Sequence, residues 1–254
     1  MVSVVTICNG QLGKLQWTYR SLKAQETSGW EWIVVNVGEH PEISEWLHAV
    51  HEVPVCHLPI PEAGKYGAMQ AGVEAAHGEW VLFMEAGNRF FMSSTFRRAM
   101  AELADELDFV AGATVYETRY GQKVWQVRPY EVIDHERPLS LDSALIRRRL
   151  LIRYPLSDRY RWAGDYAFLY RIVRPSVKAL RCPMTVVDRL SWWNHPDYLA
   201  LEREYREIQG RMDGWGDKMA WIGFEISETL RRTLRVFIPD IFLPDRANNK
   251  YLYR

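Results

Sequence analysis

Three short polar segments each follow an apolar run, and their side chains are suited to binding a polar ligand. They are Asn9, Asn36 and the turn Glu85-Ala86-Gly87-Asn88. An Asn amide both donates and accepts hydrogen bonds, and a carboxylate accepts them. If the three segments meet in the fold, they form one polar binding site.

The segments between them alternate in periodicity. Short apolar runs typical of buried strands cover residues 2–7, 30–35, 53–58 and 80–84, and helical spacing covers 15–24, 43–50 and 66–76. The alternation predicts a mostly parallel sheet with helices on both faces, whose strands end at one edge. Ligands bind at that edge in open α/β sheets, so we expect Asn9, Asn36 and residues 85–88 to converge there. The first turn lacks Gly-x-Gly-x-x-Gly, which argues against an NAD-dependent oxidoreductase.

The second half of the chain has a different organisation. A strand pair is predicted over 109–115 and 123–127, around Tyr120-Gly121-Gln122, and residues 143–151 suit a helix or the start of a strand. Helices are predicted over 162–173, 197–212 and 219–237, and Asp165 lies near the start of the first of them. No internal repeat or low-complexity segment interrupts this pattern.

The composition argues against several classes of protein. The 32 Lys and Arg residues balance 32 Asp and Glu residues, so no global positive field would gather nucleic acid. Cys8, Cys56 and Cys182 are far apart and form no CxxC, which fits a reducing compartment. The first residues lack the basic leader and apolar core of a signal peptide, and no apolar run is long enough to span a bilayer. These features predict a cytoplasmic protein without a nucleic-acid partner.

Four segments, in this order, resemble the inverting glycosyltransferases of family 2. They are VSVVTICNGQLGKLQWTYRSLKAQ, WEWIVVNVG, EAGKYGAMQAGVEAAHGEWVLFMEAGN and WAGDYAFLYRI. The likeness is to the branch that acts in bacterial polysaccharide and related glycan synthesis. It implies a GT-A fold over 1–215, with a nucleotide-sugar-binding half at 1–110 and an acceptor and catalytic-base half at 111–215. A C-terminal helix and tail at 216–254 would follow.

The resemblance implies transfer of a sugar from a nucleoside-diphosphate sugar to an acceptor hydroxyl, with inversion. Asp165 matches the base that deprotonates the acceptor, although an Asp in the first turn of a helix is also favoured by the helix dipole. Matching positions assign donor contacts to Asn9, Asn36, Glu62, Tyr66, Gln70 and Glu85, and acceptor contacts to Trp162, Trp192 and Trp193. Amides at the start of the helix near Tyr66 would attract phosphate. Lys65 adds a positive charge there, but a solvated surface lysine is the commoner case.

A divalent metal, Mg²⁺ or Mn²⁺, is also implied, because the charge of the leaving diphosphate must be neutralised. The resemblance places it at Glu85, Asn88 and His195. Two departures leave metal use open: the usual Asp-x-Asp turn is replaced by residues 85–88, and Asn36 replaces an Asp. A second interpretation therefore remains, a non-catalytic GT-A-like module that binds a sugar nucleotide or a partner.

The predicted C-terminal helix carries Arg231, Arg232 and Arg235 on its polar side and continues into apolar residues at 237–243. One interpretation is a peripheral helix at the inner membrane that approaches a lipid-linked acceptor. The other is a helix that docks on the core or on the second subunit of a homodimer. Acidic residues on the same helix dilute its basic face and favour docking. The acceptor itself, a glycan, a lipid-linked sugar or a small molecule, is not specified.

Overall fold

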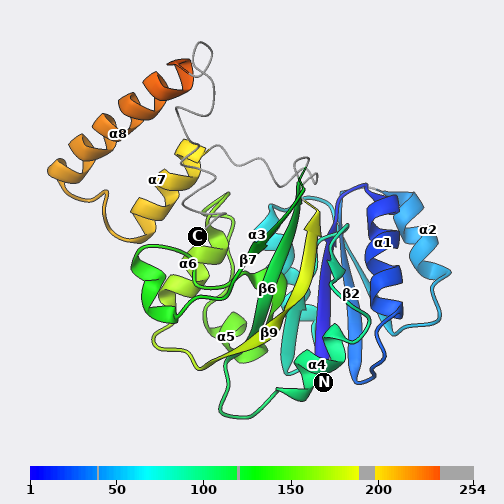
Figure 1. Ribbon diagram of the computed structural model, residues 1–254. Helices are drawn as coiled ribbons and strands as arrows, with labels where there is room; N and C mark the ends of the chain where they lie inside the picture. The colour runs from blue at the N-terminus through cyan, green and yellow to red at the C-terminus, as the bar shows by residue number, and fades with distance from the viewer. Residues whose placement is uncertain (39, 119–120, 189–197, 235–254) are drawn as a thin grey trace.

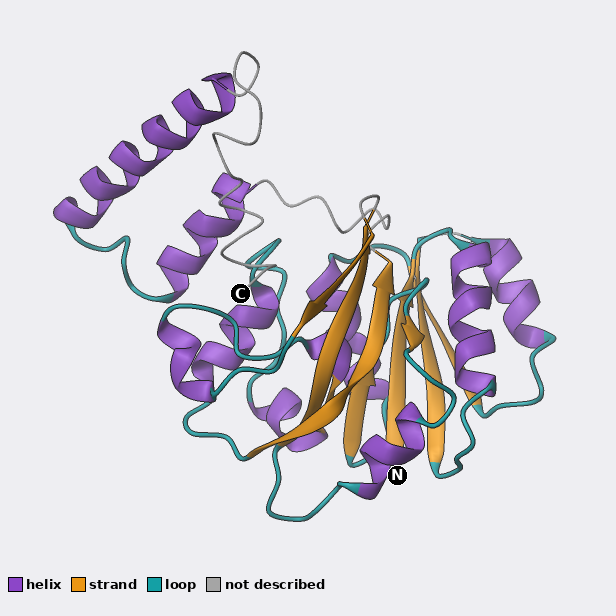
Figure 2. Cartoon of the chain, viewed as in Figure 1, coloured by secondary structure: helices purple, strands orange, loops and turns teal. Residues whose placement is uncertain are grey.

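The protein forms a nine-stranded sheet with helices on both faces (Figure 1 and Figure 2). The computed structural model describes residues 1–38, 40–118, 121–188 and 198–234. The strand order is β3-β2-β1-β4-β8-β6-β9-β5, and β7 pairs with β6 outside this path. The mixed α/β class predicted from the alternating periodicity is confirmed.

The first half of the chain alternates strand and helix as predicted. Its elements are β1 (Val2–Cys8), α1 (Leu12–Lys23), β2 (Trp30–Val37), α2 (Pro41–His48), β3 (Val55–Ile60), α3 (Lys65–Ala75), β4 (Trp80–Phe83), β5 (Arg89–Phe90) and α4 (Thr95–Ala101). Every strand and helix expected over residues 2–84 is present, with ends that differ by a few residues. β5 and α4 are additional to the prediction.

The second half is more irregular. Its elements are β6 (Phe109–Thr118), β7 (Gly121–Trp125), η1 (Tyr130–Asp134), η2 (Leu141–Ser143), β8 (Ala144–Arg147), α5 (Arg148–Arg153), α6 (Gly164–Arg171), β9 (Val177–Asp188), α7 (Tyr198–Ile208) and α8 (Trp215–Leu234). The segment 143–151 is both a strand and a helix, because β8 passes directly into α5. Gly121 and Gln122, expected in a turn, belong to β7 instead.

Six of the nine described strands run in one direction, and the parallel arrangement predicted for residues 2–84 is confirmed. The pairings of the sheet as a whole are mixed, four parallel and four antiparallel. β1 pairs in parallel with β2 and β4, β2 with β3, and β6 with β9. Three strands run the other way: β8 between β4 and β6, β7 beside β6, and β5 beside β9. The pairing of β6 with β9 shifts register around Pro183, which has no N–H to donate.

Both faces of the sheet are covered, which explains the continuous apolar runs in its strands. All seven residues of β1 are buried. Val5 and Ile7 pack into a core shared with α3, α5 and α6, whereas Val2 and Val4 pack into a second core shared with α1, α2 and α4. Alternate residues of one strand thus support two different layers of helices.

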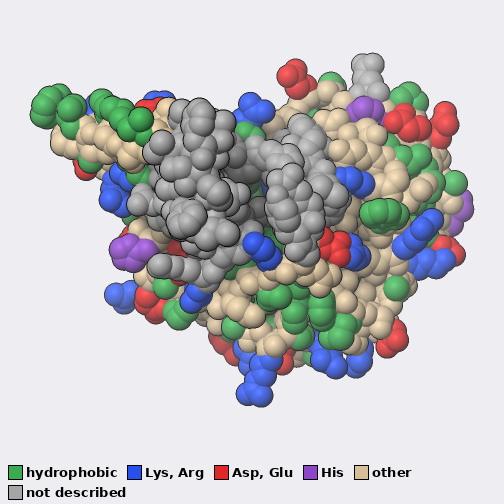
Figure 3. Space-filling view, turned by 45° about the horizontal axis from the view of Figure 1, so that its top comes forward, with side chains coloured by type: hydrophobic (Ala, Val, Ile, Leu, Met, Phe, Trp, Pro, Cys, Tyr) green, Lys and Arg blue, Asp and Glu red, His purple; other side chains and the backbone are tan. Residues whose placement is uncertain are grey.

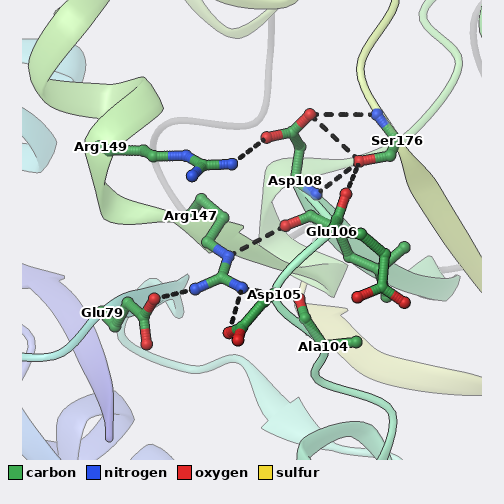
Figure 4. A network of polar contacts seen from close by, with 9 residues as sticks. Glu79, Ala104, Asp105, Glu106, Asp108, Arg147, Arg149 and Ser176 are labelled. Carbon is green, nitrogen blue, oxygen red and sulfur yellow. Dashed lines mark hydrogen bonds and ion pairs between the residues drawn. The ribbon is translucent and has the colours of Figure 1, made fainter.

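A buried arginine closes the amino edge of the parallel strands (Figure 4). Arg147 ends β8, is 3% exposed, and lies 4.2 Å from the ring of Trp80. Its guanidinium contacts Glu79 and donates to the carbonyls of Leu107 and Ala104 at 3.0 and 2.6 Å. The network fixes β8 to β4 and to the start of β6, so the opposite, carboxyl edge is left for a binding site.

The C-terminal helices lie to one side of the sheet, and α8 projects from the body (Figure 1 and Figure 3). Apolar side chains at helical spacing on α8 are exposed, namely Met219, Ile222, Ile226 and Leu230. Within the described residues, no helix combines the length and the hydropathy that crossing a bilayer requires. The side chains of Arg231 and Arg232, and all of residues 235–254, lie outside the described part of the chain, so the predicted basic face is not described.

Helix α3 packs unusually close to the sheet at Gly72. A Cβ there would overlap Val5 Cγ1 and lie 3.1 Å from Val35 Cγ2. We therefore expect Gly72→Ala to lower the free energy of unfolding by about 1–3 kcal/mol, because the added methyl group forces the helix off the sheet. Gly13→Ala in α1 is the matched control, since nothing lies within 4 Å of its Cβ position. Urea unfolding should show little loss or a gain of up to about 1 kcal/mol for the control, and equal losses would contradict the packing argument.

Candidate active site

The carboxyl ends of β1, β2 and β4 lie side by side, which brings the three polar segments together. Cys8 pairs with Asn36 in the register of β1 and β2. On the other side of β1, the N–H of Ala86 donates to the carbonyl of Ile7 at 3.0 Å. Since neighbouring strands are about 4.8 Å apart, Asn36 and Glu85 lie roughly 10 Å from each other across β1. The structure thus has the edge that the sequence predicts.

His40, at the start of α2, links the first two of these segments. Its Nε2 lies 3.1 Å from Asn9 Oδ1, and its carbonyl lies 3.5 Å from Asn36 Nδ2. Gly10 and Gly38 both adopt positive φ, and a Cβ at either would lie within 3 Å of the His40 ring. The two glycines therefore make room for a side chain that the sequence pattern does not single out.

Glu85 carries the carboxylate of the acidic turn, and it is ion-paired with Lys65 at the start of α3. The two side chains are 9% and 21% exposed. Burial lowers the pKa of Lys65, but the charges of Glu85 and Asp142 outweigh it and raise that pKa above its usual value. Lys65 is thus a fixed ammonium in the site, and the expectation of a solvated surface lysine is wrong.

Three buried polar atoms at this edge have no hydrogen-bond partner among the described residues. They are Asn36 Oδ1, Glu85 Oε2 and Asn88 Nδ2. The residues that carry them are only 1%, 7% and 2% exposed. Buried polar atoms are nearly always hydrogen-bonded, so these three are positioned to exchange hydrogen bonds with a bound ligand or an ordered water.

Asp165 lies in the first turn of α6 and is 9% exposed. One of its carboxylate oxygens is ion-paired with Arg137, and the other accepts the N–H of Tyr166 at 2.8 Å. The hydroxyl of Tyr66 lies 3.4 Å from the second oxygen and 3.0 Å from the carbonyl of Trp162. Because Tyr66 directly follows Lys65, consecutive residues of α3 contact Asp165 and Glu85.

Comparison with known proteins identifies the family of this chain. The profile described as Glycosyl transferase family 2 matches residues 3–164. The chain belongs to glycosyl transferase family 2. An uncharacterised glycosyltransferase of Mycobacterium tuberculosis is 30% identical over 104 residues, which are 41% of this chain and 40% of that protein. The match thus spans two fifths of the length of that relative.

Solved structures share the GT-A fold of the family. The S. aureus TarS 1-349 structure in complex with UDP-GlcNAc aligns with a TM-score of 0.64 at 13% identity, over 97% of this chain and 77% of that one. The mannosyltransferase PcManGT from Pyrobaculum calidifontis, in complex with GDP-Man and Mn²⁺, aligns with a TM-score of 0.59 at 16% identity, over 78% and 60%. At such low identity the likeness shows the fold alone.

In this family 2 chain, the start of α6 is held by a residue from α7. The carboxylate of Glu204 accepts the N–H groups of Arg161, Trp162 and Ala163 at 3.0, 2.9 and 2.7 Å. Those donors precede the first turn of α6 and would otherwise lack helical partners. Glu204 therefore holds the segment that leads into α6, whereas the Asp165 carboxylate accepts the N–H of Tyr166 in the first turn and also contacts Arg137 and Tyr66.

The start of α3 is occupied by an anion of the protein itself. The carboxylate of Asp158 accepts the N–H groups of Gly64 and Tyr66 at 3.1 and 2.9 Å. A Cβ at Gly64 or Gly67 would overlap this carboxylate, so both glycines provide its cradle. The expectation that these amides attract phosphate is wrong for this structure, because Asp158 fills the position.

The remaining residues predicted for the site differ in exposure and contacts, where the structure describes them. Glu62 is exposed, and the amide of Gln70 is engaged, since it accepts the N–H of Leu156 at 3.0 Å and lies 3.3 Å from Glu74. Trp162 is half-buried beneath the guanidinium of Arg161, at 5.0 Å from its ring. The predicted residues Trp192, Trp193 and His195 lie outside the described residues.

The predicted metal site does not fit the side chains that the structure describes. Among those residues, no group of three or more His, Cys, Asp or Glu side chains is arranged to hold an ion. Glu85 is already paired with an ammonium, and Asn88 offers only a neutral amide oxygen where a second carboxylate would bind a cation more strongly. A metal ion at this turn would therefore need ligands from outside the described residues.

A separate open groove of about 660 Å³ lies beside α1 and β5. Trp17, Arg20, Phe91 and Met92 line it, and Arg89 and Glu117 form an ion pair of 2.6 Å at its side. None of the predicted site residues that the structure describes lines this groove. The chemistry of the chain is therefore better sought at the edge where the three strands end.

The Glu204 contacts generate a stability prediction. Glu204→Ala should lower the free energy of unfolding by about 1–3 kcal/mol, because three backbone donors lose a charged acceptor. Glu207→Ala on the same helix is the control, since Glu207 is 38% exposed and pairs only with Arg203 four residues earlier among the described contacts. Thermal unfolding should separate the two variants by several degrees, and equal melting temperatures would contradict the capping role.

Proposed function

We propose that this chain transfers a sugar from a nucleoside-diphosphate sugar to an acceptor hydroxyl, with inversion and with Asp165 as the base. The observation that carries the proposal is the set of unpartnered buried atoms of Asn36, Glu85 and Asn88. The start of α3 connects this set to Asp165, because Lys65 contacts Glu85 and Tyr66 contacts Asp165. Family membership and the GT-A fold support it. Complexes of TarS with UDP and with UDP-GlcNAc, and of PcManGT with GDP-Man, support a donor of this class.

On the donor side, the unpartnered atoms match the polar groups of a nucleotide sugar. Asn36 Oδ1 would accept from an N–H of the base, and Asn88 Nδ2 would donate to an oxygen of the ribose or phosphate. Glu85 Oε2 would accept from a sugar hydroxyl. The proposal also keeps Asn9 and Tyr66 beside the donor, where contacts to His40 and Asp165 hold them.

On the acceptor side, Asp165 would take the proton of the attacking hydroxyl. The new bond joins the acceptor oxygen to the anomeric carbon, and the bond from that carbon to the diphosphate oxygen breaks on the opposite face. Burial raises the pKa of Tyr66 to about 12, so its phenol keeps its own proton beside Asp165 and does not compete for the proton of the acceptor. Arg137 balances the charge of the carboxylate.

The wider assignment follows from the same resemblance. We place the donor site in residues 1–110 and the acceptor site in 111–215, with Trp162, Trp192 and Trp193 beside the acceptor. The setting is bacterial polysaccharide or glycan synthesis in the cytoplasm, on a glycan, lipid-linked or small-molecule acceptor. The exposed apolar stripe of α8 would face a second subunit or a membrane surface that carries such an acceptor. The resemblance also implies a divalent cation at Glu85, Asn88 and His195, and the pairing of Glu85 with Lys65 competes with it.

The proposal predicts a separation of binding from turnover at Asp165. Asp165→Asn keeps the shape of the side chain but removes the base, so the release of nucleoside diphosphate from a donor sugar should fall by about 10²–10⁴-fold. Binding of UDP or GDP, followed as a rise in melting temperature, should persist. Turnover would be measured against a panel of UDP- and GDP-sugars, with water as the acceptor in the absence of an identified one.

Asp213→Asn, at an exposed position between α7 and α8, is the control and should leave turnover unchanged. If neither the wild type nor Asp165→Asn turns over any nucleotide sugar, yet both bind one equally, the non-catalytic module is the correct interpretation. If no nucleoside diphosphate raises the melting temperature of the wild type, the donor site itself is wrong.

A further inference from the structure

The acidic turn of this chain already holds a cation of its own. Lys65 Nζ is ion-paired with Glu85 Oε1, and its side chain is 21% exposed. We propose that the Lys65 ammonium neutralises the diphosphate of the donor, in place of a divalent metal ion. This inference rests on the proposed function, because it names how the same site compensates the charge of its donor.

The charges around the turn require such a cation. The carboxylates of Glu85 and Asp142 both act on Lys65, and Asp165 is paired with Arg137. A diphosphate brings further negative charge into this buried region, where repulsion between like charges is strong. Lys65 is ion-paired with the turn, and Lys14 acts on Glu85 only as a weaker, more distant charge, so among the described residues Lys65 is placed best to offset the repulsion.

Lys65 also has the hydrogen-bonding capacity for the task. An ammonium carries three N–H donors, and the contacts of the described residues use one of them on Glu85. The others are available to phosphate oxygens at the mouth of the site. Since Lys65 is the first residue of α3 and that helix packs tightly on the sheet, its charge is held in place before the donor binds.

The same ion pair disfavours a metal ion at Glu85. A divalent ion bound to this carboxylate would lie within a few ångströms of the ammonium, and the repulsion between them is poorly screened in a buried site. If Lys65 moved away to avoid that contact, the ammonium would lose its ion pair with Glu85. Among the described residues, no group of three or more acidic, Cys or His side chains is arranged to hold an ion and so to offset this repulsion.

The test measures binding of UDP and GDP by calorimetry in EDTA and in Mn²⁺ or Mg²⁺. The wild type should bind one of them with the same affinity under both conditions. Lys65→Met would strand a buried carboxylate and endanger folding, so the informative pair is Glu85→Gln and the double variant Lys65→Met with Glu85→Gln. The double variant should bind about tenfold to hundredfold more weakly than Glu85→Gln in EDTA, which isolates the lysine.

Lys178→Met, at the amino edge of the sheet on β9, is the control for loss of a lysine and should bind as the wild type does. Binding by the wild type only when Mn²⁺ or Mg²⁺ is present would overturn this inference while the proposed function stands. Equal affinities for Glu85→Gln and the double variant would overturn it as well. Failure of the wild type to bind either nucleotide under both conditions would overturn the proposed function itself.

Discussion

The site depends on one constraint, the close packing of helix α3 on the face of the sheet, which holds the start of that helix at the carboxyl edge. Gly72 allows the helix to lie directly on β1 and β2. Two consecutive residues at its start then make the contacts of the site. Lys65 pairs with Glu85, which follows β4, and Tyr66 contacts Asp165 of α6. A displacement of α3 would separate both contacts together. The placement of the charges at the start of the helix therefore depends on the packing in its middle.

Much of the fold follows from local patterns in the sequence. The buried run of β1 and the helical spacing of α3 predict a parallel sheet covered on both faces, and the convergence of Asn9, Asn36 and residues 85–88 follows from the shared edge of parallel strands. The second half is less predictable. β8 turns directly into α5, so one short segment serves two structures, and neither period is sustained long enough to be recognised.

The partners of the site residues are beyond sequence patterns, because they come from distant elements. Arg137, Asp158 and Glu204 each contact the region around α3 or the start of α6. A charged residue in an exposed helix has no local signature that marks it as a cap for another helix. Lys65 illustrates the same limit, since its burial depends on a carboxylate 20 positions away.

The two amides that replace expected carboxylates are consistent with a cation built into the chain. Asn88 is 2% exposed and Asn36 is 1% exposed, so an Asp at either position would place another charge in a buried region. A buried carboxylate without a cation to pair with is strongly destabilising. A metal ion would supply that cation in a site with an Asp-x-Asp turn. Where one lysine supplies it and already faces Glu85 and Asp142, a further carboxylate would add uncompensated charge, and a neutral amide at position 88 keeps the hydrogen-bonding capacity of the turn without it.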